Sequence, residues 1–396
     1  MSTTTIQRIT IQEAGEVAYK LATYAFLHTP PLPNKEEYIS RGSARRGVVY
    51  YAAYEDNQAV AMAAHHAMTQ SVRGKLFPAS GLSAVATDPS ARRKGLAKRV
   101  VQKLLSDIRE EGFAFSCLYP FRESFYERLG YVPFPRPRFV QFTPNALEPL
   151  LKKDLGGQVE CCLNTDRGKW EDYFAFCRKV QAGMHGMTVF DHVTPIFKDY
   201  NERWLALAKV NGETVGAVVY SFEGETISQF SLRAVNFYYT TPQGRFLLLE
   251  WLARHLNQAS QIELWLAPND YPDTWFTDLD YTNGIMTKPP MGRVLDVANI
   301  AGMQTGSGRF TARITDSYCP WNEGMWTFES CGEGLTVQPG SHPDCDLTIQ
   351  GLSALVYGVN DPAELAFRGW GEPSTGVQEV LREMFPRKVP YIHERF

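Results

Sequence analysis

A basic segment at residues 92–98 is the clearest place in the chain where residue types and spacing indicate chemistry. It follows the apolar run 81–87 and precedes a stretch whose apolar residues recur at helical spacing up to Gly112. A loop that opens a helix leaves the first backbone N–H groups of that helix free to bind an anion, and Gly95 lets the backbone approach it closely. The segment therefore predicts a pyrophosphate site. A solvated basic helix start is the alternative interpretation of the loop taken alone.

The residues around this segment predict the elements that must hold it in place. Periodicity predicts, in chain order, a helix at 12–28, strands at 48–54, 58–71 and 81–87, a helix at 96–112 and a strand at 113–119. A strand, a crossover helix and a second strand parallel to the first form an α/β unit.

Changes in composition divide the chain of 396 residues into three predicted domains, at 1–150, 151–288 and 289–396. Prolines at 133–144 end the first domain. The second repeats its order, with a helix at 170–179, strands at 204–209, 215–222 and 234–240, a helix at 244–257 and a strand at 262–267. The third has strand patterns at 310–315 and 324–329 and helix patterns at 352–357 and 377–385.

Two motifs in the first domain resemble one enzyme superfamily. Residues 92–97 match the (Q/R)xxGx(G/A) signature of the GNAT superfamily of N-acetyltransferases, and residues 124–131 resemble its FYxxxGF/Y segment. Neither a P-loop nor a G-x-G-x-x-G motif is present, which argues against a nucleotidase or a dehydrogenase.

The whole chain resembles the Eis (enhanced intracellular survival) acetyltransferases. That family joins a catalytic GNAT domain, a degenerate GNAT-like domain and a domain like a sterol carrier protein, so the resemblance implies mixed α/β sheets in tandem GNAT-like domains. The turn of the second domain, 241–245, keeps one glycine but lacks the basic cluster. We therefore expect CoA to bind only the first domain.

The resemblance also implies the site residues. Acetyl-CoA, the cosubstrate, is expected to contact Val85, Ala86, Thr87, Arg92, Arg93, Lys94, Gly95, Leu96, Ala97, Lys98, Phe121 and Arg122. The family uses a tyrosine as general acid and the terminal carboxylate as general base, which correspond to Tyr126 and Phe396.

These two roles suit amide formation from a thioester. One proton must leave the attacking amine and another must reach the departing sulfur. A terminal carboxylate is ionised at neutral pH, and a phenol can donate its proton. The plainer alternatives are that Tyr126 is a core aromatic and that Phe396 is a frayed end.

Composition excludes several other classes of protein. Lys and Arg total 40 against 43 Asp and Glu, without a block of like charge, so we expect no nucleic-acid partner. No signal peptide and no apolar run of membrane-spanning length is evident, so we expect a cytoplasmic protein without a membrane partner. Seven cysteines without zinc-ligand spacing predict no metal. Only one of His65 and His66 can face a site, and a surface or core role is expected for both.

The acceptor and two other functions stay open. The resemblance implies a small-molecule or peptide amine, either an aminoglycoside-like polyamine or a lysine, and a homo-oligomer, namely a hexamer. A non-catalytic regulator that binds acyl-CoA is one alternative. A lipid or peptide carrier acting through the third domain is the other.

Overall fold

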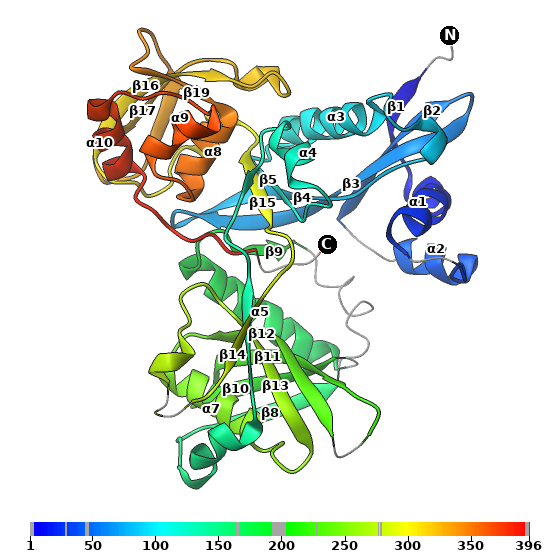
Figure 1. The fold of residues 1–396 in the computed structure, drawn as a ribbon, viewed down its shortest axis with the longest axis vertical. Coiled ribbons are helices and arrows are strands. Elements are labelled where there is room, and N and C mark those ends of the chain that lie inside the picture. The colour runs from blue at the N-terminus through cyan, green and yellow to red at the C-terminus, as the bar shows by residue number, and fades with distance from the viewer. Residues whose placement is uncertain are drawn as a thin grey trace. The chain divides into compact units, whose positions relative to one another are not determined.

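The computed structural model describes residues 4–27, 30–43, 47–163, 166–191, 203–226, 229–275, 277, 279–392 and 396. The chain forms two compact units (Figure 1). The first contains Met1–Phe134, His185–Pro195 and Pro290–Phe396, and the second contains Pro135–Met184 and Ile196–Pro289.

An eight-stranded mixed sheet organises the first unit. Its order is β1-β2-β3-β4-β5-β15-β6, with β9 paired to β3. The strands are β1 (Thr5–Ile9), β2 (Val48–Glu55), β3 (Gln58–Val72), β4 (Lys75–Thr87), β5 (Phe115–Leu118), β6 (Val132–Pro133), β9 (Thr188–Phe190) and β15 (Met291–Val294). The helices are α1 (Ile11–Phe26), α2 (Lys35–Ser43), α3 (Leu96–Glu110) and α4 (Glu123–Glu127).

Alternation along the strands places α1 and α3 on opposite faces of this sheet. Tyr50 and Ala52 of β2 pack in the cluster that contains the apolar face of α1. Tyr51 and Ala53 pack with α3. Successive strand residues point to opposite faces, so the two helices cover the two sides. Because α3 packs on the sheet to which β4 belongs, the sheet fixes the position of this helix relative to that strand.

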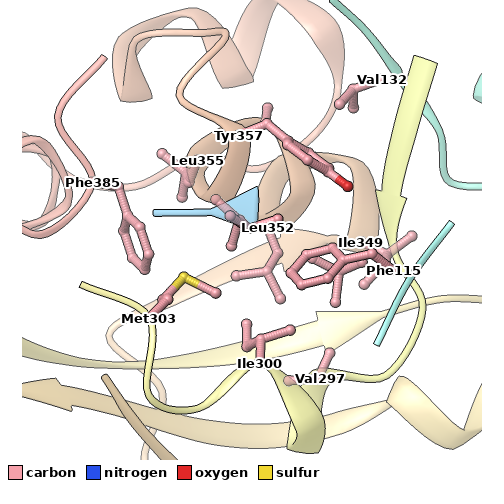
Figure 2. Packing of buried hydrophobic residues seen from close by; sticks show 14 of the residues in the cluster. Phe115, Val132, Val297, Ile300, Met303, Ile349, Leu352, Leu355, Tyr357 and Phe385 are labelled. Carbon is pink, nitrogen blue, oxygen red and sulfur yellow. The ribbon is translucent and has the colours of Figure 1, made fainter. Parts of the chain in front are cut away.

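A smaller sheet in the first unit has the order β18-β17-β16-β19. Its strands are β16 (Gly308–Thr315), β17 (Gly324–Ser330), β18 (Thr336–Pro339) and β19 (Cys345–Thr348), and its helices are α8 (Ile349–Tyr357), α9 (Leu365–Arg368) and α10 (Thr375–Met384). Figure 2 shows Leu352 and Leu355 of α8 facing Ile300 and Met303. The same apolar cluster includes Phe115 of β5, so the C-terminal residues share a core with the first sheet.

The second unit repeats part of this topology. Its sheet has the order β14-β7-β13-β12-β11-β10-β8, and α7 crosses between the parallel strands β12 and β13, as α3 does between β4 and β5. The elements are β7 (Arg138–Phe142), β8 (Gln158–Leu163), α5 (Arg167–Gly183), β10 (Trp204–Val210), β11 (Glu213–Glu223), β12 (Phe230–Tyr239), α7 (Pro242–Ala253), β13 (Ala259–Leu266) and β14 (Thr282–Ile285).

Short 3₁₀ turns occur in both units. They are η1 (Pro89–Ala91), η2 (Pro144–Lys152), η3 (Pro272–Thr274), η4 (Val297–Ile300), η5 (Pro320–Asn322) and η6 (Pro362–Glu364).

The division between the units differs from the boundary expected at residue 150. It falls after Phe134, because β7 pairs with β13 and β14 in the second sheet. Conversely, β15 lies after the boundary expected at 288 but pairs with β5 and β6 in the first sheet. Backbone pairing across distant segments, rather than composition, sets both limits.

Candidate active site

The carboxyl ends of β4 and β5 form a fork in the first unit. The two strands run parallel and pair only from Ala79–Phe115 to Gly81–Cys117. β5 ends at Leu118, whereas β4 continues to Thr87 along β3, with a register shift in that pairing and a left-handed Ala84 (φ 49°). Within the described ranges no strand pairs with β4 beyond Gly81 on the β5 side. Backbone groups of residues 82–87 on that side can bind an extended ligand as an added strand would.

The start of α3 leaves backbone N–H groups without a capping side chain. Gly95 is the N-cap of α3 with φ 75°, Arg93 has φ 65°, and no side chain caps this end of the helix. The first intrahelical bond runs from Arg99 N to Gly95 O, so the N–H groups of residues 96–98 have no partner within the helix. This geometry and the positive end of the helix dipole favour an anion.

The side chains of the loop before α3 differ in whether they already contact other residues. Arg93 is exposed, and no ion pair joins it to any described residue. Lys94 pairs with Glu55 at 2.8 Å, and the Arg92 guanidinium lies 5.9 Å from the ring centre of Tyr24. The side chain of Leu96 is buried in the core, so Leu96 can offer only its backbone. Arg93 is thus the most available cation of the segment.

Tyr126 lies just beyond the fork, on the short helix α4. Its ring is 4% exposed and packs edge-on against Phe121 at 5.6 Å and Phe125 at 5.0 Å. Burial raises the pKa of this phenol well above its ordinary value. The hydroxyl makes no hydrogen bond with any residue that the structure describes. A protonated, unengaged phenol is available as a proton donor.

Phe396 occupies the branch point of the fork. A Cβ on Gly81 would lie 3.0 Å from the Phe396 ring, which shows how closely the ring approaches β4. The same ring lies 5.7 Å from Tyr119 and 5.6 Å from His66. The Phe396 ring thus lies against β4, and the role of its carboxylate stays a prediction.

The structure thus gathers the predicted residues in one unit. Val85, Ala86 and Thr87 lie at the end of β4. Residues 92–95 belong to the loop that follows, and Leu96, Ala97 and Lys98 begin α3. Phe121 is exposed beside Tyr126, and Arg122 is the exposed N-cap of α4.

Sequence reasoning missed His66 and Ser83. His66 Nε2 and Ser83 Oγ lie 2.8 Å apart on β3 and β4, next to Phe396. His65 points to the other face, where it contacts Ser80, and burial lowers its pKa to about 4. The alternation of the strand indicated that one histidine could face a site, but not which one.

The corresponding turn of the second unit has a different geometry. The hydroxyl of Thr241 accepts a hydrogen bond from Gly244 N, so a side chain caps α7. A Cβ on Gly244 would lie 2.3 Å from Val215 O, which shows that this glycine serves close packing against β11. The guanidinium of Arg245 lies over the rings of Tyr239 and Trp275. This turn lacks the open, basic N-terminus of α3.

Neither a metal-binding cluster nor a membrane-spanning helix is found among the described residues. No group of three or more His, Cys, Asp or Glu side chains in these ranges could hold a metal ion. None of the helices in this part of the chain combines the length and the apolar character that crossing a bilayer requires.

Comparisons with known proteins identify two domains. Residues 5–134 match the model of the acetyltransferase (GNAT) domain, and residues 298–393 match the sterol carrier protein domain. No curated protein matches the sequence.

Solved structures share the fold over the full length. A GCN5-related N-acetyltransferase from Anabaena variabilis ATCC 29413 superposes with a TM-score of 0.82 at 16% identity. A probable N-acyltransferase from Enterococcus faecalis V583 gives 0.83 at 20%, and Eis1 from Mycobacterium abscessus gives 0.78 at 17%. Each comparison covers 100% of both chains.

Proposed function

We propose that this chain, whose residues 5–134 are an acetyltransferase domain of the GNAT type, transfers the acetyl group of acetyl-CoA to an amine. The observation that carries the proposal is the joint presence of the uncapped, basic start of α3 and the open edge of β4 in one unit. The first suits a pyrophosphate. The second suits the amide groups of a pantetheine arm.

Different residues of the chain bind different parts of acetyl-CoA in this proposal. Arg93 and the N–H groups of residues 96–98 hold the phosphates, with Arg92, Lys94 and Lys98 adding positive charge around them. The backbone of residues 85–87 pairs with the extended arm. Phe121 and Arg122 flank the arm where β5 ends. The thioester then lies at the fork, between Tyr126 and Phe396.

Tyr126 is assigned as general acid. The amine nitrogen attacks the thioester carbon, a C–N bond forms and the C–S bond breaks. Tyr126 donates its phenolic proton to the leaving sulfur. Burial keeps the phenol protonated until that step, because the phenolate is disfavoured in an apolar surrounding.

The carboxylate of Phe396 is assigned as general base, which takes the proton that the amine loses. The proposal rests on the contacts of the Phe396 ring with Gly81, Tyr119 and His66 at the fork. One residue added after Phe396 moves the carboxylate by up to about 3.6 Å, beyond hydrogen-bond reach of the amine. A tag at the C-terminus should therefore abolish turnover that an N-terminal tag preserves. Equal rates in two folded proteins would remove this carboxylate from the mechanism.

The acceptor class is proposed as an aminoglycoside-like polyamine or a lysine amine of a peptide. A screen of polyamines, aminoglycosides and lysine peptides, with CoA thiol release and mass spectrometry of the acceptor, tests the function. We expect acceptor-dependent release with one acetyl group gained per CoA freed. Binding of acetyl-CoA without transfer to any of these amines would favour a regulator. A cytoplasmic homohexamer is implied by the resemblance alone and stays a prediction.

A further inference from the structure

The helix that carries Tyr126 receives hydrogen bonds from the C-terminal residues of the same unit. Gln350 Nε2, on α8, donates to Glu127 O at 2.8 Å. The Arg368 guanidinium, on α9, donates to Glu127 Oε1 at 3.1 Å. Arg293, on β15, donates to Leu129 O. We call Arg293, Gln350 and Arg368 the α4 clamp.

The clamp donates hydrogen bonds to residues that follow Tyr126 closely in the chain. Glu127 follows Tyr126 in the chain, and Leu129 N donates to Tyr126 O at 2.9 Å. Gly130 (φ 91°) turns the chain so closely that a Cβ there would lie 2.7 Å from Arg293 Nη1. Because α4 spans only five residues, its own hydrogen bonds cannot fix its position, and tertiary contacts must do so.

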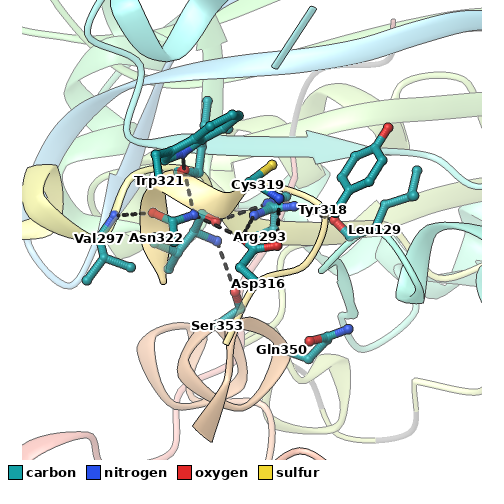
Figure 3. Close-up of polar contacts among 12 residues, drawn as sticks. Leu129, Arg293, Val297, Asp316, Tyr318, Cys319, Trp321, Asn322, Gln350 and Ser353 are labelled. Carbon is teal, nitrogen blue, oxygen red and sulfur yellow. Dashed lines mark hydrogen bonds and ion pairs between the residues drawn. The ribbon is translucent and has the colours of Figure 1, made fainter. Parts of the chain in front are cut away.

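Arg293 itself is held rigidly. Its side chain is fully buried and forms an ion pair with Asp316, which also accepts hydrogen bonds from Asn322 Nδ2 at 2.9 Å and from Cys319 N at 3.0 Å (Figure 3). Figure 3 shows Gln350 and Ser353 of α8 beside this network. A buried pair whose remaining sites are satisfied fixes one geometry, and removing one partner leaves an uncompensated charge.

We propose that the α4 clamp positions the phenol of Tyr126 for proton transfer, so that the sterol carrier protein domain takes part in catalysis through α4. The inference rests on the proposed role of Tyr126 as general acid. Gln350, Arg368 and Arg293 are positioning residues, since their donors reach α4 and the turn after it. A small displacement of a reacting group is enough to slow catalysis strongly.

The test uses the two clamp residues nearer the surface, because replacing buried Arg293 can prevent folding. Gln350→Met removes the donor and keeps the side-chain length. Arg368→Met removes the donor and keeps an unbranched aliphatic stem, but it also removes the guanidinium that lies 4.1 Å from the ring centre of Trp370, so Arg368→Lys accompanies it. The variant carrying both changes is compared with wild type, each with Tyr126 and with Tyr126→Phe. Arg382→Met is the matched control, because Arg382 pairs with Asp361 at 2.8 Å in the same domain. Thermal melts check folding.

With Tyr126 present, the double clamp variant should lower kcat by about ten-fold or more and leave the KM for acetyl-CoA unchanged. With Tyr126→Phe it should lower kcat no further, because there is no phenolic proton left to position. Arg368→Lys should retain most of the activity, and Arg382→Met should match wild type.

Three results would overturn the inference. An unchanged kcat in the double variant shows that the clamp is not needed. An equal fold loss with Tyr126 present and with Tyr126→Phe shows that the clamp acts on stability or on another group. If Tyr126→Phe alone has a normal kcat, Tyr126 is not the general acid and the clamp has no phenol to position. That result contradicts the proposed function, and it leaves the observed contacts of the clamp unaffected.

Discussion

A phenol serves as a general acid only where its surroundings keep the proton on it until the leaving group needs it. The pKa of Tyr126 is raised by burial among Phe121, Phe125 and Tyr131, and its hydroxyl has no partner among the described residues. The aromatic packing and the proton-donor role therefore depend on different atoms of one side chain. Substitution can separate the two.

Tyr126→Phe should lower kcat by roughly 10²–10⁴-fold, because the proton donor is lost while the ring packing is kept. The KM for acetyl-CoA and the melting temperature should stay close to the wild-type values. Steady-state thiol release with a saturating amine measures the change. Tyr271→Phe makes the same change of atoms at an exposed tyrosine of the second unit and serves as the control. Unchanged turnover would reassign Tyr126 to packing.

The buried histidines give a pH dependence at the residue scale. Burial lowers the pKa of both His65 and His185 from 6.5 to about 4. Because each binds its proton less readily in the folded state, the free energy of unfolding should fall as the pH falls from 6.5 towards 4. Thermal melts at pH 7.5, 6 and 5 measure this, above the range in which carboxylates titrate. His65→Asn should reduce the slope. A flat profile between pH 6.5 and 5 would contradict these pKa shifts.

The motif residues could be predicted from the sequence, and their neighbours could not. Gly95 and Tyr126 stand in short patterns whose spacing is set by a local loop and helix. His66 and Ser83 meet only through the register of β3 with β4, which no local pattern records. Arg293 carries no local signal either, since its partner Asp316 lies 23 residues away.

At the scale of elements, the starts of α3 and α7 explain why one site per chain is expected. α3 begins at a left-handed glycine without a side-chain cap, whereas at the start of α7 the Thr241 hydroxyl accepts a hydrogen bond from Gly244 N. The same crossover topology thus presents an anion site in one unit and a closed helix end in the other.

Arg93→Glu should weaken acetyl-CoA binding by about 2–3 kcal/mol, on the order of 10²-fold, because a like charge replaces a phosphate partner. The KM for acetyl-CoA reports the change, and kcat at saturation should be nearly preserved. Lys103→Glu makes the same change of charge on α3, where Lys103 pairs with Asp107 at 2.6 Å, and is the control. Similar KM values for the two variants would show a general charge effect instead of a phosphate contact.

The order of the main elements followed from periodicity, and the exceptions have physical reasons. The expected helix at 12–28 is α1, and the expected strand at 113–119 is β5. The strand β15 was not expected, because four residues carry no usable period and its partners β5 and β6 are far away in the chain. The helix α4 is similarly too short to be distinguished from a loop.

At the scale of the whole molecule, the acetyltransferase and sterol carrier protein domains share one core. Met68, Val72 and Phe77 of the β3–β4 hairpin are buried in a cluster with residues of α8 and α10. Arg73, at the turn of this hairpin, donates to Leu355 O at 2.8 Å and to Pro386 O at 3.0 Å. The C-terminal domain thus packs its core against the β3–β4 hairpin.

A chain cut after Pro289 should therefore fail to fold cooperatively. It lacks β15 and leaves the apolar end of the β3–β4 hairpin exposed, which favours aggregation. Circular dichroism melts and size-exclusion chromatography measure the outcome beside the full chain. A soluble, cooperatively melting product that binds acetyl-CoA would show that residues 5–134 are independent of the C-terminal domain.

Calorimetric titration of the full chain with acetyl-CoA tests the central claim most directly, because it counts the sites that β4 and α3 are proposed to form. We expect one site per chain, lost or strongly weakened in Arg93→Glu and unaffected by Arg245→Glu at the start of α7. The first substitution alters the open helix end, and the second alters the capped one. Two sites per chain, or a single site that follows Arg245 instead of Arg93, would contradict the account.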